Sequence, residues 1–220
     1  LIEEFSYDKT GNRITKKVGS NPILNYSYPA ANHKLIDAGN GARAFDASKS
    51  VSQAQIIALL EAARWAPSCF GDQPWRFIVW DKNVDAAAWQ HAFDCLAPSN
   101  QTWVKAAPIL MLTCADTLFG HNQQPNRWAQ HDTGAAAENL CLQASHMGLA
   151  AHQMGGFNAD LAREKFAIPA QFTPMAFVCV GYAGDPNQLP DELKQRELAE
   201  RKRKLLGELF FTSSWGKSIV

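Results

Sequence analysis

The sequence predicts one domain of mixed helices and strands from about residue 50 onward, preceded by an N-terminal arm of different character. Three observations support this prediction. Helical and strand-like segments alternate after Ser50, a capped amphipathic helix leads through a Pro/Gly-rich loop into a strand, and 220 residues can bury one substantial core. Acidic and basic residues are equal in number, 21 of each, so no global field favours nucleic acid or an anionic membrane as partner.

The N-terminal arm, residues 1–47, joins β-prone stretches through Gly-Asn turns. Its aromatic residues recur after about 20 residues, as at Tyr7-Asp8 and Tyr26, and this spacing resembles the YD repeats of Rhs-type proteins. Two such repeats cannot bury a core unaided, because each needs neighbours to cover its apolar face. We interpret residues 1–47 as a fused Rhs/YD-like fragment, with an irregular, turn-rich arm as the alternative, and residues 48–220 as the main domain.

The first helix of the main domain is predicted from its cap and its apolar spacing. Ser52 and Gln55 form a capping-box pattern, and Pro67 must end the helix because proline disfavours helical geometry in the residue before it. A polar loop follows, and residues 77–80 resume as a strand. The apolar residues that recur at helical spacing are Ile56, Leu59, Leu60 and Ala63.

The middle of the chain continues the alternation. We expect a helix over residues 86–96, a polar loop over 97–101 and a central strand over 108–114, whose continuous apolar run is too short for a helix. A long helix over 127–147 ends at Gly148. Its small-residue patch at 134–137 permits close approach of another helix, within the chain or across a dimer.

The last third supplies a strand over 149–157 that opens into a glycine turn, a short helix capped by Asn158, and a buried strand over 175–181. Pro190 then starts a charged helix predicted to carry the basic run 201–204. Such a run is usually a solvated face. The tail from Leu205 to Val220 is too apolar for a free disordered end, so we expect it to pack on something.

Several classes of site have little support in the sequence. The five cysteines are odd in number and lack a Cys-x-x-Cys pair, which predicts reduced thiols in a cytoplasmic protein. No apolar run approaches the roughly 20 residues that cross a bilayer, no signal peptide is visible, and no zinc, Rossmann or P-loop spacing occurs. His131 and Asp132 are adjacent on a helix and point in different directions, so we expect a surface or capping role for them.

One segment carries most of the functional information. Residues 63–77 read Ala-Arg-Trp-Ala-Pro-Ser-Cys-Phe-Gly-Asp-Gln-Pro-Trp-Arg-Phe, and this run closely resembles the signature loop of the nitroreductase family of FMN-dependent oxidoreductases. The resemblance extends over about residues 43–216. It implies an α+β fold with a mixed sheet flanked by helices, in an obligate homodimer with two FMN molecules at the subunit interface.

The resemblance also assigns residues at the start of the domain. Family members carry a motif Arg-Arg-Ser-x-Arg-x-Phe, whose last arginine and phenylalanine match Arg43 and Phe45. Arg43 would then lie at the flavin pyrimidine edge. The first three motif positions read Gly39-Asn40-Gly41 here, which removes two phosphate-binding cations and a hydroxyl. At about 1.5 to 3 kcal/mol for each charge-assisted hydrogen bond, this loss weakens FMN affinity by two or more orders of magnitude.

The remaining cofactor residues follow from the same comparison. One subunit would supply the loop residues Pro67, Ser68 and Cys69, braced by Gln73, with Gly71 where many relatives have asparagine. The other would supply Asn100 at the pyrimidine edge and the segment Met154-Gly155-Gly156, whose backbone amide points at flavin N5. Arg201 and Arg203 match the family's C-terminal phosphate contacts, and this match favours a binding role for the basic run over a solvated one.

The resemblance implies an oxidoreductase in which no side chain acts as acid, base or nucleophile and no metal takes part. NADH or NADPH would bind over the flavin, and a nitroaromatic, quinone or similar electron-poor molecule would use the same pocket afterwards, giving ping-pong kinetics. Two alternatives stay open. Dehalogenase-like or dimethylbenzimidazole-synthase-like relatives carry a lid insertion, for which residues 117–126 offer little room, and a cofactor-poor, non-catalytic fusion is the other.

Overall fold

The computed structural model describes residues 3–7, 13–18, 24–25, 42–200 and 202–220. The chain divides into two compact units, residues 1–37 and residues 38–220, which we describe separately. In the first unit, β1 (Glu3–Tyr7), β2 (Arg13–Val18) and β3 (Leu24–Asn25) form an antiparallel sheet in that order. A register shift between Ser6 and Tyr7 interrupts the pairing of β1 with β2.

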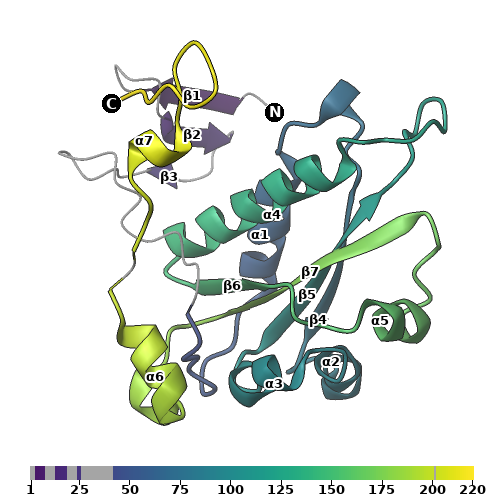
Figure 1. Ribbon diagram of the computed structural model, residues 1–220. Coiled ribbons are helices and arrows are strands. Elements are labelled where there is room, and N and C mark those ends of the chain that lie inside the picture. Colours follow the sequence, from purple (N-terminus) through teal and green to yellow (C-terminus); the bar gives the residue numbers. More distant parts are fainter. Residues whose placement is uncertain (1–2, 8–12, 19–23, 26–41, 201) are drawn as a thin grey trace. The chain divides into compact units, whose positions relative to one another are not determined.

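The second unit is an α+β fold, as the sequence predicts. Its sheet has the strand order β4-β5-β7-β6, with helices on both faces (Figure 1). The elements are α1 (Gln53–Arg64), β4 (Trp75–Asp81), α2 (Ala86–Phe93), α3 (Pro98–Val104), β5 (Ile109–Asp116), α4 (Ala129–His146), β6 (Ala150–Met154), α5 (Ala159–Lys165), β7 (Phe172–Gly181), α6 (Asp191–Leu198) and α7 (Leu206–Leu209), with short 3₁₀ turns at Cys69–Gly71 and Pro186–Gln188.

The sheet of the second unit is antiparallel in each of its described pairings, whereas we expected a mixed sheet. β5 pairs with β7 through Ile109 and Val180, and β6 pairs with β7 through Ala150 and Gly181. β5 and β6 therefore run in the same direction. They do not form a parallel pair because β7 lies between them and runs opposite to both.

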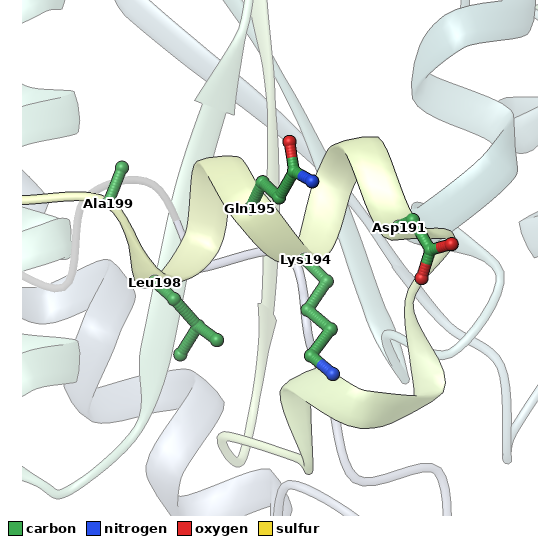
Figure 2. Close-up of a pocket in the computed structure, with 5 residues that line it drawn as sticks. All are labelled: Asp191, Lys194, Gln195, Leu198 and Ala199. Atoms are coloured by element: carbon green, nitrogen blue, oxygen red, sulfur yellow. The ribbon is translucent and has the colours of Figure 1, made fainter.

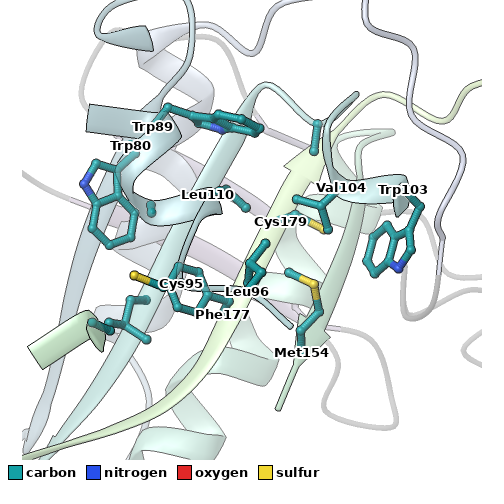
Figure 3. Close-up of a cluster of buried hydrophobic side chains, with 14 of the residues drawn as sticks. Trp80, Trp89, Cys95, Leu96, Trp103, Val104, Leu110, Met154, Phe177 and Cys179 are labelled. Carbon is teal, nitrogen blue, oxygen red and sulfur yellow. The ribbon is translucent and has the colours of Figure 1, made fainter. Parts of the chain in front are cut away.

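Two apolar cores cover the two faces of this sheet. Successive residues of β5 alternate between them: Ile109 and Met111 face α1 and α4, whereas Leu110 and Leu112 face the side of α2, α3 and α5. The continuous apolar run of β5 follows from this double coverage, because neither face meets water. Figure 3 shows the second core, whose labelled side chains are Trp80, Trp89, Cys95, Leu96, Trp103, Val104, Leu110, Met154, Phe177 and Cys179.

The helix ends show which local signals were decisive. The Ser52–Gln55 capping box at α1 is present in both directions, and Gly148 ends α4 with a φ of 71°. The segment 97–101, expected as a polar loop, instead contributes to α3. Pro98 occupies the first turn of α3, where its missing N–H costs nothing, and this position outweighs the polar composition.

The basic run is not helical, contrary to the sequence prediction. α6 ends at Leu198, and Ala199 has an extended backbone with φ −65° and ψ 140°. The described residues of the run, Lys202 to Lys204, therefore follow the helix as irregular chain. In the tail, Phe211 pairs with Ser218 in an isolated bridge, and large apolar side chains remain exposed in the single chain, namely Leu205, Leu206, Leu209, Phe210, Trp215, Ile219 and Val220.

A short strap, residues 42–46, enters the second unit beside the end of β7. Phe45 is only 2% exposed, and it forms an isolated antiparallel β-bridge with Ala183. The Gly184 N–H donates to the Ala44 carbonyl at 2.8 Å, and the Asp46 N–H donates to the Tyr182 carbonyl at 2.9 Å. The strap therefore belongs to the main core, although we assigned residues up to 47 to the N-terminal arm.

Gly184 permits this close approach, which gives a test of the strap. A Cβ at Gly184 would lie 2.5 Å from the Phe45 carbonyl carbon and 2.6 Å from its oxygen, so backbone must move. We expect Gly184→Ala to lower the free energy of unfolding by about 1–3 kcal/mol in urea denaturation. Gly155→Ala is the control, since a Cβ there meets nothing within 4 Å. Equal stability of both variants would contradict the packing described.

Candidate functional site

The 67–73 loop joins α1 to β4 and is ordered by its own hydrogen bonds. The Ser68 hydroxyl accepts the Gln73 N–H at 3.0 Å, the Gly71 N–H donates to the Ser68 carbonyl, and the Asp72 N–H donates to the Cys69 carbonyl. Gln73 thus takes part in bracing the loop through its backbone N–H, with the Ser68 hydroxyl as its partner. Pro67 and Gln73 are exposed, while Ser68 and Cys69 are partly exposed, so the loop presents a hydroxyl and a thiol at the surface.

The loop backbone is strained. Phe70 and Gln73 adopt positive φ values of 55° and 51°, and Gly71 lies between them at 67°. Left-handed backbone costs a residue with a Cβ of order 1–3 kcal/mol, and such strain concentrates at functional sites. The Phe70 ring is 81% exposed and meets Phe119 and His121 edge-on, at centroid distances of 5.7 and 5.5 Å.

Two carboxylates fix this loop to the rest of the fold. The Asp72 Oδ1 accepts the Gly120 N–H at 2.9 Å, which joins the loop to the segment after β5. The Asp132 Oδ2, on α4, accepts the Cys69 N–H at 2.9 Å, and its Oδ1 lies 3.0 Å from His131 Nδ1. Asp132 is only 4% exposed and caps no helix end, so our prediction of a surface or capping role is wrong for it. The His131 side chain is exposed, as predicted, but it meets Asp132 instead of pointing away from it.

A second group of predicted residues gathers around α3. The Asn100 Nδ2 donates to the Gly156 carbonyl at 3.0 Å, and the Ala97 N–H donates to the same oxygen at 2.9 Å. A Cβ at Gly156 would lie 2.9 Å from Asn100 Nδ2, whereas one at Gly155 would meet nothing. The Met154 side chain is buried in the core, so this residue offers the site its backbone.

Arg43 joins this second group through an aromatic stack. Its guanidinium lies 5.9 Å from the Trp103 ring centroid, and the His152 ring packs on Trp103 at 4.6 Å. The Arg43 N–H donates to the Glu197 carboxylate at 3.0 Å, and the guanidinium lies 3.7 Å from the same carboxylate. α6 therefore holds the strap and its cation against α3.

The structure says little about the role of the C-terminal cations. Arg201 lies outside the described residues. Arg203 is exposed, and its guanidinium donates to the neighbouring Lys202 carbonyl at 3.0 Å. A surface pocket lies along α6, and Figure 2 shows the residues that line it: Asp191, Lys194, Gln195, Leu198 and Ala199. None of these is a predicted cofactor residue.

The structure therefore divides the predicted site residues between the two faces of the sheet. The 67–73 loop continues from Ala66 in the core under α1 and α4, whereas Trp103 and Met154 belong to the core under α2, α3 and α5. This second side also carries Asn100, which lies on α3, together with Gly156 and Arg43, which contact α3 residues. One chain thus presents two separate groups of predicted site residues, which we call the loop half-site and the α3 half-site.

Comparison with known proteins shows which family contains this chain. The Nitroreductase family model matches residues 42–182, which include both half-sites. The chain belongs to the nitroreductase family. The match begins at the strap, and the comparisons give no support to the Rhs/YD interpretation of residues 1–47. Among the described residues of the chain, the helices are too short or too polar to span a membrane.

Individual relatives agree with the family match. A solved structure named "oxidoreductase containing FMN" is 31% identical, with a TM-score of 0.77 over 88% of this chain and 96% of its own. An uncharacterised 15.4 kDa protein of Mycolicibacterium smegmatis is 32% identical over 66% of this chain and 99% of its own length. A Methanothermobacter thermautotrophicus protein named "Putative NADH dehydrogenase/NAD(P)H nitroreductase" is 27% identical over 62% of this chain and 70% of its own length.

Three residues that support the half-sites were missed in the sequence. Asp132 falls on the buried face of α4 together with Ala129 and Ala136, so helical spacing contained the signal. Trp103 gave no such signal, because its helix was expected as a loop. Glu197 is one of several acids on the charged helix α6, and the sequence does not indicate which of them contacts Arg43.

The cysteines differ sharply in exposure, and Cys69 is the only one of the five that is not buried. Burial raises the pKa of Cys114 to about 11 and that of Cys141 to about 12, and it also raises the pKa of Cys95 and Cys179. These four thiols therefore resist both solvent contact and ionisation.

This difference predicts the reactivity of the native protein toward Ellman's reagent. We expect about one fast-reacting thiol per chain without added flavin, and all five after unfolding, because the thiolate is the reactive form. Cys69→Ser should remove the fast phase and leave the slow thiols unchanged. A fast phase that survives this substitution would show that a residue described as buried is open to solvent.

Proposed function

We propose that this member of the nitroreductase family is an FMN-dependent NAD(P)H oxidoreductase that acts on electron-poor small molecules such as nitroaromatics and quinones. The observation that carries the proposal is the pair of half-sites, each formed by residues matching the family's flavin contacts. The relatives support the cofactor and the reductant, since one is named as containing FMN and another as an NAD(P)H nitroreductase. The choice between NADH and NADPH and a cytoplasmic location stay predictions.

The residues present fit a flat, polar cofactor. Within the described residues, the N–H groups of Gly155 and Gly156 form no hydrogen bond with the chain, and a side chain at Gly155 would have open space. Unpaired amides beside the Asn100 carboxamide are suited to the polar edge of a flavin ring. On the other half-site, the Ser68 hydroxyl accepts one hydrogen bond from the loop and keeps its proton for a ligand.

FMN, when bound, supplies the acceptance and donation of hydride, which amino-acid side chains do not provide. The chain's own residues bind and orient. In this proposal the glycine amides and Asn100 hold one edge of the ring, and Arg43 places positive charge on the same side. Ser68 and Cys69 contact the ring from the partner subunit, and Phe70 excludes water at the rim.

The two half-sites lie on opposite faces of one sheet, so we propose that a homodimer completes each site. Exposed apolar side chains on α1 and at the start of α4, Ile57, Trp65 and Trp128, supply a surface that a second copy would cover. The apolar tail after residue 204 would pack on the partner. Residues 1–37 have no part in this proposal, and the catalytic domain begins at the strap.

The phosphate end of the cofactor would meet fewer cations here than in other family members. Residues 39–41 replace the family's Arg-Arg-Ser, and Arg203 with Arg201 supply the proposed remaining cations. A lid-bearing chemistry is less favoured, because the segment between β5 and α4 contains turns but no helix in the described structure. A cofactor-poor, non-catalytic protein is an outcome of the following test.

The visible spectrum tests the function directly. The purified chain is reconstituted with FMN, desalted, and then mixed anaerobically with NADPH or NADH. We expect a retained flavin band that bleaches with at least one reductant and returns on addition of a quinone or nitroaromatic. Heat-denatured protein carried through the same desalting controls for trapped FMN.

A colourless protein after stoichiometric reconstitution would overturn the proposed function and favour the non-catalytic alternative. A band that persists without bleaching would separate cofactor binding from reductase activity. In that case the FMN assignment stands and the NAD(P)H assignment fails.

A further inference from the structure

Asp132 stands out among the described carboxylates because it is buried and bonds to the backbone of the loop half-site. Its Oδ2 accepts the Cys69 N–H at 2.9 Å, across 63 residues of sequence. The other oxygen faces His131, whose side chain is exposed. A buried carboxylate is costly unless it is hydrogen-bonded, so this contact constrains α4 and the loop together.

The position of Asp132 on its helix strengthens the contact. It lies in the first turn of α4, where unpaired N–H groups give the helix end a partial positive charge that favours an anion. The 18-residue helix packs against α1, and its Asn139 Nδ2 donates to the Ala62 carbonyl at 3.3 Å. The carboxylate is therefore held by a rigid element, whereas the segment that it contacts is a loop.

The loop needs such an anchor because its backbone is strained. Cys69 immediately precedes Phe70, the first of the residues at positive φ, and Asp72 supplies the other connection through Gly120. Between these two anchors the loop turns sharply and directs Phe70 outward. Without the bond at Cys69, residues 69–71 lose the contact that fixes the entry to the turn.

We infer that Asp132 is a positioning residue that sets the conformation of the 67–73 loop and thereby presents Ser68 and Cys69 to the cofactor. This inference rests on the proposed function for its link to flavin. Its structural part, that Asp132 controls the loop, is independent of any cofactor. The adjacent His131 is not required, because the Cys69 bond uses the other carboxylate oxygen.

The thiol of Cys69 reports on the loop directly. We measure its alkylation rate in the full-length chain as purified, since the other four cysteines are buried. In Asp132→Ala we expect the rate to rise about threefold or more through local opening of the loop, with the other thiols still protected. Asp132→Asn keeps an acceptor oxygen and should give a smaller increase. This order distinguishes positioning from general destabilisation, which would expose several thiols.

Asp160→Ala is the matched control, because it also removes an acid from the first turn of a helix but has no contact with the loop in the described structure. We expect its Cys69 rate, and that of His131→Gln, to stay within about twofold of the unaltered chain. A change below threefold in Asp132→Ala would overturn the inference. If that variant does not fold, the same comparison applies to Asp132→Asn, whose rate must then exceed both controls.

The flavin part is measured separately. FMN should slow alkylation of Cys69 in the unaltered chain if the loop contacts the cofactor, and Asp132→Ala should raise the FMN dissociation constant about tenfold or more. Absence of protection in the unaltered chain would count against the proposed function alone. Protection by FMN together with an unchanged dissociation constant in Asp132→Ala would count against the positioning role alone.

Discussion

The burial of β5 and β7 on both faces is the constraint on which the rest of the structure depends. These central strands carry apolar side chains in both directions, so each face must be covered by helices. α1 and α4 cover one face, and α2, α3 and α5 cover the other (Figure 1). Each core then fixes one loop or helix end at the rim of the sheet.

The division of the site follows from this coverage. The 67–73 loop leaves α1 on one face, and Asp132 of α4 holds it there. Asn100 and Gly156 meet on the opposite face, beside α3. A flat cofactor cannot contact both groups through the sheet of one chain, and for this reason we propose a site shared between two chains.

Local signals in the sequence were sufficient for much of the fold. The Ser52 cap, the proline at 67 and the glycine at 148 each act within a few residues, so their effects were predictable. α3 was missed because its polar residues look like a loop, whereas Pro98 in its first turn and the burial of Trp103 and Val104 together favour a helix. The antiparallel pairing was missed because strand order depends on contacts between residues far apart in sequence.

The sequence could nominate residues for the candidate site, whose cofactor role stays a prediction, but it could not nominate the groups that support them. The 63–77 run identified the loop, and the glycine turn identified Gly155 and Gly156. The partners of these segments could not be predicted, because Asp132 and Glu197 contact backbone more than 60 residues away. Which acid on a helix meets which amide is decided by the tertiary fold, and the printed sequence gives only candidates.

The central claim is that each site combines the loop half-site of one chain with the α3 half-site of another. The FMN content of a mixed dimer of two variants tests it most directly. Cys69→Trp disables the first and Gly155→Val the second, and each variant homodimer must first be shown not to retain FMN. The two variants are co-expressed with different tags, and the mixed dimer is isolated by both. Because one of its two sites is free of both substitutions, we predict about one FMN per mixed dimer, against about two for the unaltered dimer. A mixed dimer that binds no FMN, beside an unaltered dimer that does, would contradict the shared site.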